Sequence, residues 1–422
     1  MSDNLLQPEQ TASMASPKPR VATYENGLLI VLSLVVSCML VDRMTVALLA
    51  PFIAKDLHLN NAQIGLLASA LSVTIAISGY LISALAEARN RRKLFLMACT
   101  AGFSCVTFIA RLAPSFLFLA ICRLATGVFD GPMTPLPLSI MSAESTPSRR
   151  SLNLGFLQNF CPFVLAQMLG PILLVAIATH FGWRDAFFLT GIPALVLVGL
   201  LHFFVRDPKD HRVTASVTAA AAEARPGLGA LFTYRNILLC GGISGGVGSW
   251  IFLQLTFLPL YLMRNSQLSA EHMGVVMSMT GVSGSAASLL LPWLSDKLGR
   301  KPILLAGLAV GLISPLSALY LHSYIGIAIG IFAGSFCMGL VPVYVAIIPA
   351  ETVPFSMGAQ AVAFALACSE MIGGITAPAV AGKLADIFSL RIPFWMAAGA
   401  LVAAAVLVPF LHDTSRKAVP SA

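Results

Sequence analysis

Residues 292–301 read Pro-Trp-Leu-Ser-Asp-Lys-Leu-Gly-Arg-Lys and form a short polar stretch between two long apolar stretches. A similar stretch in the first half of the chain, residues 83–93, reads Ser-Ala-Leu-Ala-Glu-Ala-Arg-Asn-Arg-Arg-Lys. The same offset in residue number separates Glu87 from Asp296 and the arginines that follow these acids. An acid and a basic run that recur at one offset indicate an internal repeat, so we predict two structurally similar halves.

The composition places the chain in a membrane. Its 422 residues are 57% hydrophobic and 10% charged, whereas soluble domains carry about 25% charged residues. A soluble enzyme, a secreted disulfide-stabilised domain and a disordered chain are therefore excluded. The eight cysteines lie in apolar stretches without a CxxC spacing, and the seven histidines do not cluster. We therefore expect no disulfide framework and no metal site.

The apolar runs have the length of membrane helices. A hydrocarbon layer about 30 Å thick requires about 20 apolar residues per helix, and the runs lack the alternation of a membrane β-barrel. We predict an all-α membrane protein with twelve transmembrane helices in two pseudo-symmetric six-helix bundles. The predicted spans cover residues 27–53, 62–86, 93–112, 115–143, 152–179, 185–205, 236–263, 271–295, 302–321, 323–349, 356–384 and 391–412.

One polar interruption divides these spans into six and six. We interpret it as a cytoplasmic linker, because a segment of this length cannot form a core of its own. The predicted organisation is a cytoplasmic N-terminal tail (1–26), a first bundle (27–205), the linker (206–235), a second bundle (236–412) and a C-terminal tail (413–422).

The basic residues predict the orientation in the membrane. Most of the 26 lysines and arginines lie in the two tails and in the loops on the same side as the tails. Because basic loops stay in the cytoplasm, both termini are predicted to be cytoplasmic. Residues 1–26 hold no apolar segment of a cleavable signal peptide. We expect a multi-pass protein of the cell inner (cytoplasmic) membrane, and the net charge of +8 reflects this orientation rather than nucleic-acid binding.

The repeated loop also carries a family resemblance. Residues 296–301 read Asp-Lys-Leu-Gly-Arg-Lys and resemble the signature loop that follows the second helix of each half in the major facilitator superfamily. The copy at 83–93 departs from that signature, since glutamate replaces aspartate and serine and asparagine replace the usual glycines. The resemblance covers residues 24–412 and implies the twelve-helix fold.

The charges of these two loops are predicted to take part in gating. An acid at this surface can cap the N-terminal dipole of a helix from the other half and hold the cavity shut on that side. Charges that only set the membrane orientation are the alternative interpretation. The predicted gating residues are Glu87, Arg91, Arg92, Asp296, Arg300 and Lys301.

Further motifs resemble two groups within the superfamily. Motifs similar to those of the anion:cation symporters lie at residues 42–43, 50–52, 351–354 and 369–374. Motifs similar to those of the spinster-type lipid transporters lie at residues 88–93, 182–184 and 206–208. The first resemblance implies uptake of an organic anion with protons, and the second implies export.

Five charged residues lie well inside the predicted spans: Asp42, Arg43, Arg123, Asp130 and Glu370. Charges in a bilayer are costly and therefore indicate functional sites. We predict proton coupling by Asp42, Asp130 and Glu370, because burial disfavours a charged carboxylate whereas a nearby guanidinium favours it. The family resemblance implies the same role for Asp42 and Asp130, and it implies that Arg43 contacts the anionic substrate. A static ion pair between the first and fourth spans is the alternative for Asp42 and Asp130, and a pair with a hydroxyl group such as that of Ser369 is the alternative for Glu370.

The predicted substrate site contains fixed cations and polar groups. Guanidinium groups suit carboxylates, so Arg43 and Arg123 favour an anionic substrate over a cationic one. Polar and aromatic residues at mid-span are further candidates for substrate contact, although membrane amides also join helices to one another. These candidates are Gln158, Asn159, Trp250, Gln254 and Tyr261.

Together these features predict a secondary active transporter rather than an enzyme. The predicted activity is proton-coupled uptake of a small organic anion, such as a sugar acid or an aromatic or aliphatic carboxylate, by alternating access. The sequence holds no GxxxxGK[ST] motif, so we expect the proton gradient to supply the energy without a cofactor. The expected partners are the organic anion, protons and the lipid bilayer, with the monomer as the working unit. Proton-coupled export of drugs or lipids is the alternative, and a non-transporting sensor is a more distant one.

Overall fold

The computed structural model describes residues 19–146, 148–206, 228–354 and 357–412. Twelve helices in this part of the chain are long and apolar enough to cross a membrane. The same residues contain no strand, which confirms the predicted all-α class. The chain is therefore a multi-pass membrane protein.

The first half contains six membrane-spanning segments, some of them interrupted by short 3₁₀ or π turns labelled η. Its elements are α1 (Pro19–Asp56), α2 (Asn61–Ala88), α3 (Arg92–Ala110), α4 (Phe116–Asp130), η1 (Gly131–Met133), α5 (Pro135–Glu144), α6 (Arg150–Gly155), η2 (Phe156–Phe160), η3 (Phe163–Leu169), α7 (Gly170–His180), α8 (Trp183–Ala186) and α9 (Phe188–Phe204).

The second half repeats this plan. Its elements are η4 (Leu228–Thr233), α11 (Arg235–Arg264), α12 (Ala270–Leu298), α13 (Arg300–Gly311), α14 (Ile313–Tyr320), α15 (Tyr324–Ser335), η5 (Phe336–Leu340), η6 (Val343–Ile347), α16 (Ile348–Thr352), α17 (Gly358–Cys368), η8 (Ser369–Thr376), α18 (Ala377–Ile387), α19 (Ile392–Leu407) and η9 (Val408–Phe410).

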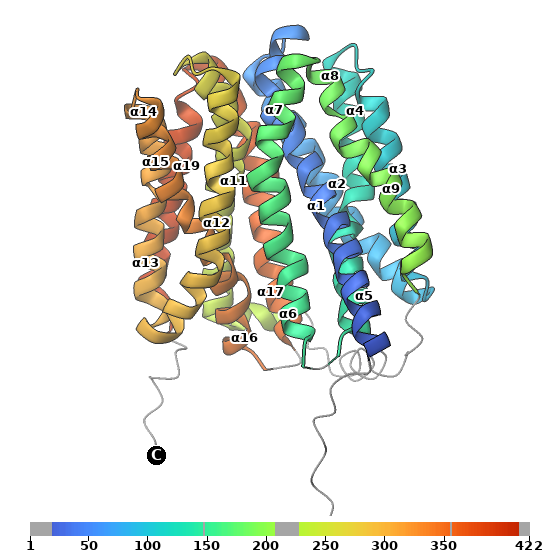
Figure 1. Ribbon diagram of the computed structural model, residues 1–422. Coiled ribbons are helices and arrows are strands. Elements are labelled where there is room, and N and C mark those ends of the chain that lie inside the picture. Colours follow the sequence, from blue (N-terminus) through green and yellow to red (C-terminus); the bar gives the residue numbers. More distant parts are fainter. Residues whose placement is uncertain (1–18, 147, 207–227, 355–356, 413–422) are drawn as a thin grey trace, which may run out of the picture.

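The two halves lie side by side, the first in blue to green and the second in yellow to red (Figure 1). Successive spans run in opposite directions, so α1 begins and η9 ends at the same face, called the terminal face below. The connections from α1 to α2 and from α18 to α19 lie at the other face, called the distal face.

The first helix starts earlier than the sequence predicts. It begins at Pro19 rather than near residue 27, so part of the predicted N-terminal tail is helical. Glu25 explains the difference, because this buried carboxylate accepts hydrogen bonds from the Asn153 side chain (2.6 Å) and the Thr146 backbone N–H (3.2 Å). These bonds hold the polar first turns of α1 against α6 and the segment that precedes it.

Most of the predicted linker at 206–235 lies outside the described residues, as do residues 1–18 and 413–422 of the predicted tails. The described end of the linker is folded, because η4 occupies its last residues and α11 begins at Arg235. Leu231 of η4 is 1% exposed and packs in a small apolar cluster at the start of α11.

The fourth span is broken in its middle. Helix α4 ends at Asp130, a 3₁₀ turn follows at Gly131–Met133, and α5 starts at Pro135. Pro132 and Pro135 have no N–H to donate to the preceding turn, so the α-helical ladder is interrupted here. The break places Asp130 at the last position of α4.

Glycines bring the two halves into close contact toward the distal face. A Cβ on Gly65 of α2 would collide with the carbonyl oxygen of Pro378 in α18. At the matching place in the repeat, a Cβ on Gly274 of α12 would lie 3.3 Å from the Cβ of Val175 in α7. Only residues without a side chain permit such an approach, so these glycines close the distal face.

Packing between the halves is weaker at the terminal face in the described part of the chain. Helix α2 packs along η8 and α18, and α12 packs along η3 and α7. Among the described residues, α6 and α17 make no comparable packing contact with the opposite half. The described conformation is thus sealed at the distal face.

Candidate functional site: a charged cavity between the halves

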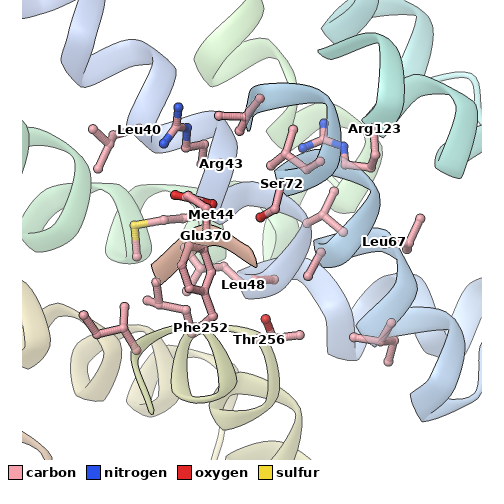
Figure 2. A pocket seen from close by; sticks show the side chains of 18 of the residues that line it. Leu40, Arg43, Met44, Leu48, Leu67, Ser72, Arg123, Phe252, Thr256 and Glu370 are labelled. Atoms are coloured by element: carbon pink, nitrogen blue, oxygen red, sulfur yellow. The ribbon is translucent and has the colours of Figure 1, made fainter. Parts of the chain in front are cut away.

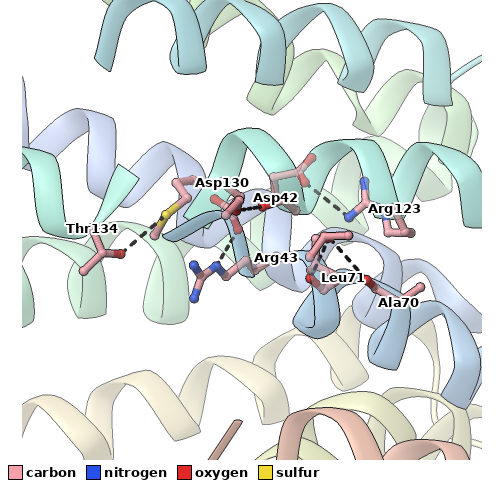
Figure 3. A network of polar contacts seen from close by, with 11 residues as sticks. Asp42, Arg43, Ala70, Leu71, Arg123, Asp130 and Thr134 are labelled. Carbon is pink, nitrogen blue, oxygen red and sulfur yellow. Dashed lines mark hydrogen bonds and ion pairs between the residues drawn. The ribbon is translucent and has the colours of Figure 1, made fainter. Parts of the chain in front are cut away.

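Two ion pairs join α1 to α4 in the first half (Figure 3). Arg43 donates from Nε to Asp130 Oδ2 at 2.6 Å, and Arg123 donates from Nη1 to Asp42 Oδ2 at 3.2 Å. Asp42 and Arg43 are neighbours on α1 and point about 100° apart, so each reaches a different partner on α4. The structure brings together all four of these predicted residues.

The two pairs differ in their surroundings. The side chains of Asp42 and Arg123 are both 1% exposed, and Asp42 Oδ1 also accepts from the Thr107 and Thr190 hydroxyls at 3.3 and 3.5 Å. Asp130 is equally buried, but its Oδ1 has no hydrogen-bond partner among the described residues. Asp42 is therefore held by three donors, whereas Asp130 depends on Arg43.

A cavity of about 180 Å³ lies between the two halves, next to these charges (Figure 2). Arg43 and Arg123 both belong to its wall. The Arg43 side chain is 27% exposed, and the Nε and Nη2 groups of Arg123 are buried without an acceptor in the described part of the chain. Unsatisfied guanidinium donors in an enclosed site favour the binding of an anion.

Glu370 brings a carboxylate from the second half to the same cavity. It lies on η8, bonds to the Ser72 hydroxyl of α2 and interacts electrostatically with Arg43. Gly374 leaves room for this contact, because a Cβ there would lie 2.7 Å from Glu370 Oε2 and 2.8 Å from Ser72 Oγ. Glu370 is a predicted site residue, but Ser72 was missed because serine is common inside membrane helices.

A second cavity of about 150 Å³ adjoins the first and shares Gln167, Ile251 and Leu255 with it. Asn159, a predicted substrate contact, lines this second cavity, whereas its neighbour Gln158 is exposed and lines neither of the two. Gln167 was missed by the sequence analysis. Its Oε1 is buried without a partner among the described residues, so it offers an unused hydrogen-bond acceptor between the two cavities.

Three predicted substrate contacts on α11 lie elsewhere. Trp250, Gln254 and Tyr261 are buried in the core of the second half and are not part of the cavity walls. Gln254 donates to the Ser314 hydroxyl of α14, and the Tyr261 ring centroid lies 4.7 Å from that of Phe394. Contacts within the second half hold Gln254 and Tyr261 in place, and a different face of α11 lines the cavity.

The predicted gating residues of the second half form a network at the terminal face. Arg300 pairs with Asp296 at 2.5 Å and with Glu351 of α16 at 2.7 Å. It also donates to the Ser295 hydroxyl at 2.7 Å. Lys301 donates to the carbonyl oxygen of Pro409 at 3.2 Å. All of these contacts lie within the second half.

The first-half copy is looser. Glu87 lies 3.9 Å from Arg92, the Glu87 side chain is 51% exposed, and Arg91 is exposed. None of the hydrogen bonds and ion pairs described for the six predicted gating residues crosses to the opposite half. The predicted latch is therefore not formed in this conformation, in which the distal face is the closed one.

An acid that the sequence analysis did not select connects the halves at the distal face. Asp386, at the end of α18, accepts the backbone N–H groups of Asn61 and Ala62, each at 2.9 Å. The first N–H groups of a helix have no partner within it. In α2 the Asn60 side chain caps the next donor, at Gln63, at 2.8 Å. Asp386 thus completes the α2 cap from the other half.

The fold and the cavity define a class of protein: a membrane transport protein with two six-helix halves around a charged central site. The chain belongs to the Major Facilitator Superfamily, whose model matches residues 32–262 and 251–422. It is accordingly a transporter and not an enzyme.

Known relatives agree with this assignment. The chain is 28% identical over 271 residues to the hexuronate transporter of Bacillus subtilis (strain 168). The aligned region covers 62% of this chain and 63% of that protein. It thus spans less than two thirds of that relative's length. The chain is 26% identical over 350 residues to the gallate transporter of Pseudomonas putida, and the aligned region covers 75% of this chain and 76% of that protein. These relatives transport organic anions, as the resemblance to that group implies.

A solved structure shows the same fold. The crystal structure of a bacterial homologue of the human lysosomal transporter spinster, in an inward-facing and unoccupied conformation, superposes with a TM-score of 0.71. The match covers 94% of this chain and 95% of that one at 18% identity. At this identity the likeness concerns the fold alone.

Proposed function

We propose that this protein takes up a small organic anion together with protons by alternating access. The observation that carries the proposal is the arrangement of Arg43 and Asp130. Arg43 stands on the cavity wall with part of its guanidinium exposed, and it supplies the only described hydrogen bond of the buried Asp130 carboxylate. A carboxylate substrate in the cavity competes with Asp130 for the same cation.

This competition links the anion to a proton. When the substrate draws Arg43 away, Asp130 is left as an unpaired buried charge, and a buried charge without a partner is neutralised rather than tolerated. The proton that neutralises Asp130 therefore enters with the anion. Departure of both restores the Arg43–Asp130 pair and resets the site.

The other acids have different positions in this scheme. Asp42 already has Arg123 and two hydroxyl donors, so we assign it first to holding Arg123 in place and second to proton coupling. Glu370 reaches Arg43 and Ser72 from the second half. Because the halves move against each other, the position of Glu370 relative to the Arg43–Asp130 pair differs between the open and the closed state. Glu370 can thereby make the coupling pair sensitive to that state.

Alternating access requires a gate on each side of the cavity. We propose that the closed distal face looks away from the cytoplasm, which puts the terminal face and both termini in the cytoplasm and the protein in the cell inner membrane. Asp296, Arg300 and Lys301, together with Glu87, Arg91 and Arg92, then serve the cytoplasmic gate. The proton gradient supplies the energy without a bound cofactor, and the monomer contains the complete pathway.

Export of drugs or lipids by proton exchange is the second candidate, because several motifs resemble those of spinster-type transporters. Purified protein in vesicles with an imposed pH gradient separates the two functions. A symporter accumulates a carboxylate inside when the outside is more acidic. Accumulation that instead requires an acidic interior would contradict uptake and support exchange.

A further inference from the structure

The charged and apolar groups are not distributed evenly around the cavity wall. Figure 2 shows Arg43 and Arg123 toward one side of the labelled residues and Phe252 and Thr256 toward the other. Most of the wall is apolar and comes from both halves. Its apolar residues are Leu40, Met44, Val46, Ala47, Leu48, Ile64, Leu67, Ala68, Leu71, Ile75, Ile251, Phe252 and Leu255.

Few polar groups remain for the body of a substrate. Ser72 and Glu370 contact each other, so among the described residues only Gln167 and Thr256 add further hydrogen-bonding groups to this wall beyond the two arginines. A sugar acid carries a hydroxyl on nearly every carbon. In this cavity most of those hydroxyls would face methyl and phenyl groups, and each unpaired hydroxyl lowers the affinity.

Charge limits the substrate further. The cavity region holds two arginines and three carboxylates, Asp42, Asp130 and Glu370, so it has no excess of positive charge when all are ionised. Protonation of one of these acids offsets one negative charge on the substrate. A second carboxylate on the substrate would have to bind Arg123, whose positive charge is already paired with Asp42.

The cavity volume is in keeping with a small ring. Its volume of about 180 Å³ is somewhat larger than the cavity of about 150 Å³ that binds benzene in another protein. We propose that the transported anion is a monocarboxylate with an apolar, single-ring body, such as benzoate or 3-phenylpropionate, rather than a sugar acid or a dicarboxylate. The carboxylate lies at Arg43, and the ring lies against Phe252 of α11 on the opposite side of the cavity. This inference rests on the proposed function.

Calorimetric titration of the purified protein in detergent tests the inference directly, because it avoids passive leakage of aromatic acids through vesicles. The probes are benzoate, 3-phenylpropionate, gluconate, galacturonate and phthalate. The two aromatic monocarboxylates are expected to bind at least tenfold more tightly than the other three. Equal or tighter binding of gluconate, galacturonate or phthalate overturns the substrate class but leaves organic-anion transport standing. Binding of none of the five contradicts both proposals.

Variants at Phe252 locate the ring. Phe252→Asn is expected to weaken benzoate binding about tenfold and to change acetate binding by no more than about twofold. Phe252→Leu is expected to retain most of the affinity for benzoate. Phe257→Leu is the matched control, since Phe257 is buried on the same helix away from the cavity. An equal loss for acetate and benzoate in Phe252→Asn would show a general disturbance and overturn the placement of the ring.

Discussion

Arg43 Nε lies 2.6 Å from Asp130 Oδ2, and this contact joins a residue on the cavity wall to one that is fully buried. The neighbouring pair, Asp42 with Arg123, has both members buried. The first pair is therefore accessible to a substrate from one side only. Such an arrangement allows an anion to change the surroundings of a carboxylate that it never touches.

Removal of Arg43 tests whether the pair behaves as a buried ion pair. Arg43→Ala leaves Asp130 buried without its partner, so the carboxylate must take up a proton for the protein to fold, which is expected to lower the stability by about 3 kcal/mol at neutral pH. The Arg43→Ala/Asp130→Asn double variant removes the group that must be protonated and is expected to regain most of that loss, but not substrate binding. Thermal unfolding of the purified variants measures the first effect, and anion titration measures the second.

Lysine at position 43 is the matched control for this experiment. Arg43→Lys keeps the charge but loses the planar fork that binds a carboxylate through two N–H groups. It is expected to retain most of the stability and to bind the anion at least tenfold more weakly. If the double variant is as unstable as Arg43→Ala alone, the Asp130 carboxyl group is not the cause of the lost stability, and the pair is wrongly described.

Alanine substitutions at the adjacent residues Gly373 and Gly374 are expected to have different effects. A Cβ on Gly374 would crowd the Glu370–Ser72 contact between the halves, whereas a Cβ on Gly373 would lie 2.6 Å from the backbone nitrogen of Ser249 within the second half. Gly374→Ala is expected to slow exchange several-fold with little change in unfolding temperature. Gly373→Ala is expected to lower the unfolding temperature. Similar effects of the two variants would argue against a specific role for the Glu370–Ser72 contact.

Asp386 predicts how the distal face opens. Asp386→Ala leaves the N–H groups of Asn61 and Ala62 without their partner across the interface. A loss of about 1 kcal/mol shifts a two-state population roughly fivefold. A cysteine introduced at Ala68, a cavity residue, in a chain without native cysteines is therefore expected to react faster with an impermeant thiol reagent applied from the distal face.

Asp56 provides the control for this measurement. It is another distal-face acid, but it bonds to Arg184 (2.6 Å) and Trp183 (3.1 Å) within the first half. Asp56→Ala is expected to leave the labelling rate at Ala68→Cys unchanged. An equal increase in both variants would mean that loss of any acid loosens this face, and Asp386 would have no particular role.

The terminal-face loops predict an asymmetry between the two copies of the repeat. Arg300 keeps Glu351 and Ser295 when Asp296 is changed, so Asp296→Asn is expected to alter the unfolding temperature little. Exchange of substrate across vesicles is expected to slow several-fold, because the latch of the closed terminal face is lost. Glu87→Gln is expected to have a smaller effect, since Glu87 is half exposed and only loosely paired. The reverse order would place the main gate in the first copy.

The fold and the charged residues of the site can be predicted from the sequence because large free energies govern both in a bilayer. These are the costs of an unsatisfied backbone hydrogen bond and of an unpaired charge in lipid. Long apolar runs are helices, since no other backbone structure of that length satisfies its hydrogen bonds in lipid. Asp42, Arg43, Arg123 and Asp130 are recognisable because a charge at that depth requires a partner. The structure joins these four as two pairs.

Neutral residues of the site are less visible in the sequence. Trp250 and Gln254 lie at mid-span as predicted, but α11 is buried on most of its surface, so depth does not indicate which face meets the cavity. Ser72 and Gln167 differ little in kind from serines and amides that only join helices. Asp386 acts through two backbone groups of another helix, and this contact depends on how the halves are arranged.

The Asp130→Asn variant tests the central claim most directly. Asparagine retains the shape and an acceptor for Arg43 but cannot exchange a proton. In vesicles that are more acidic outside, this variant is expected to lose accumulation of the anion while it still exchanges internal for external anion in the absence of a gradient. Accumulation at the level of the unmodified protein would contradict the account, because the proton would then enter by another route.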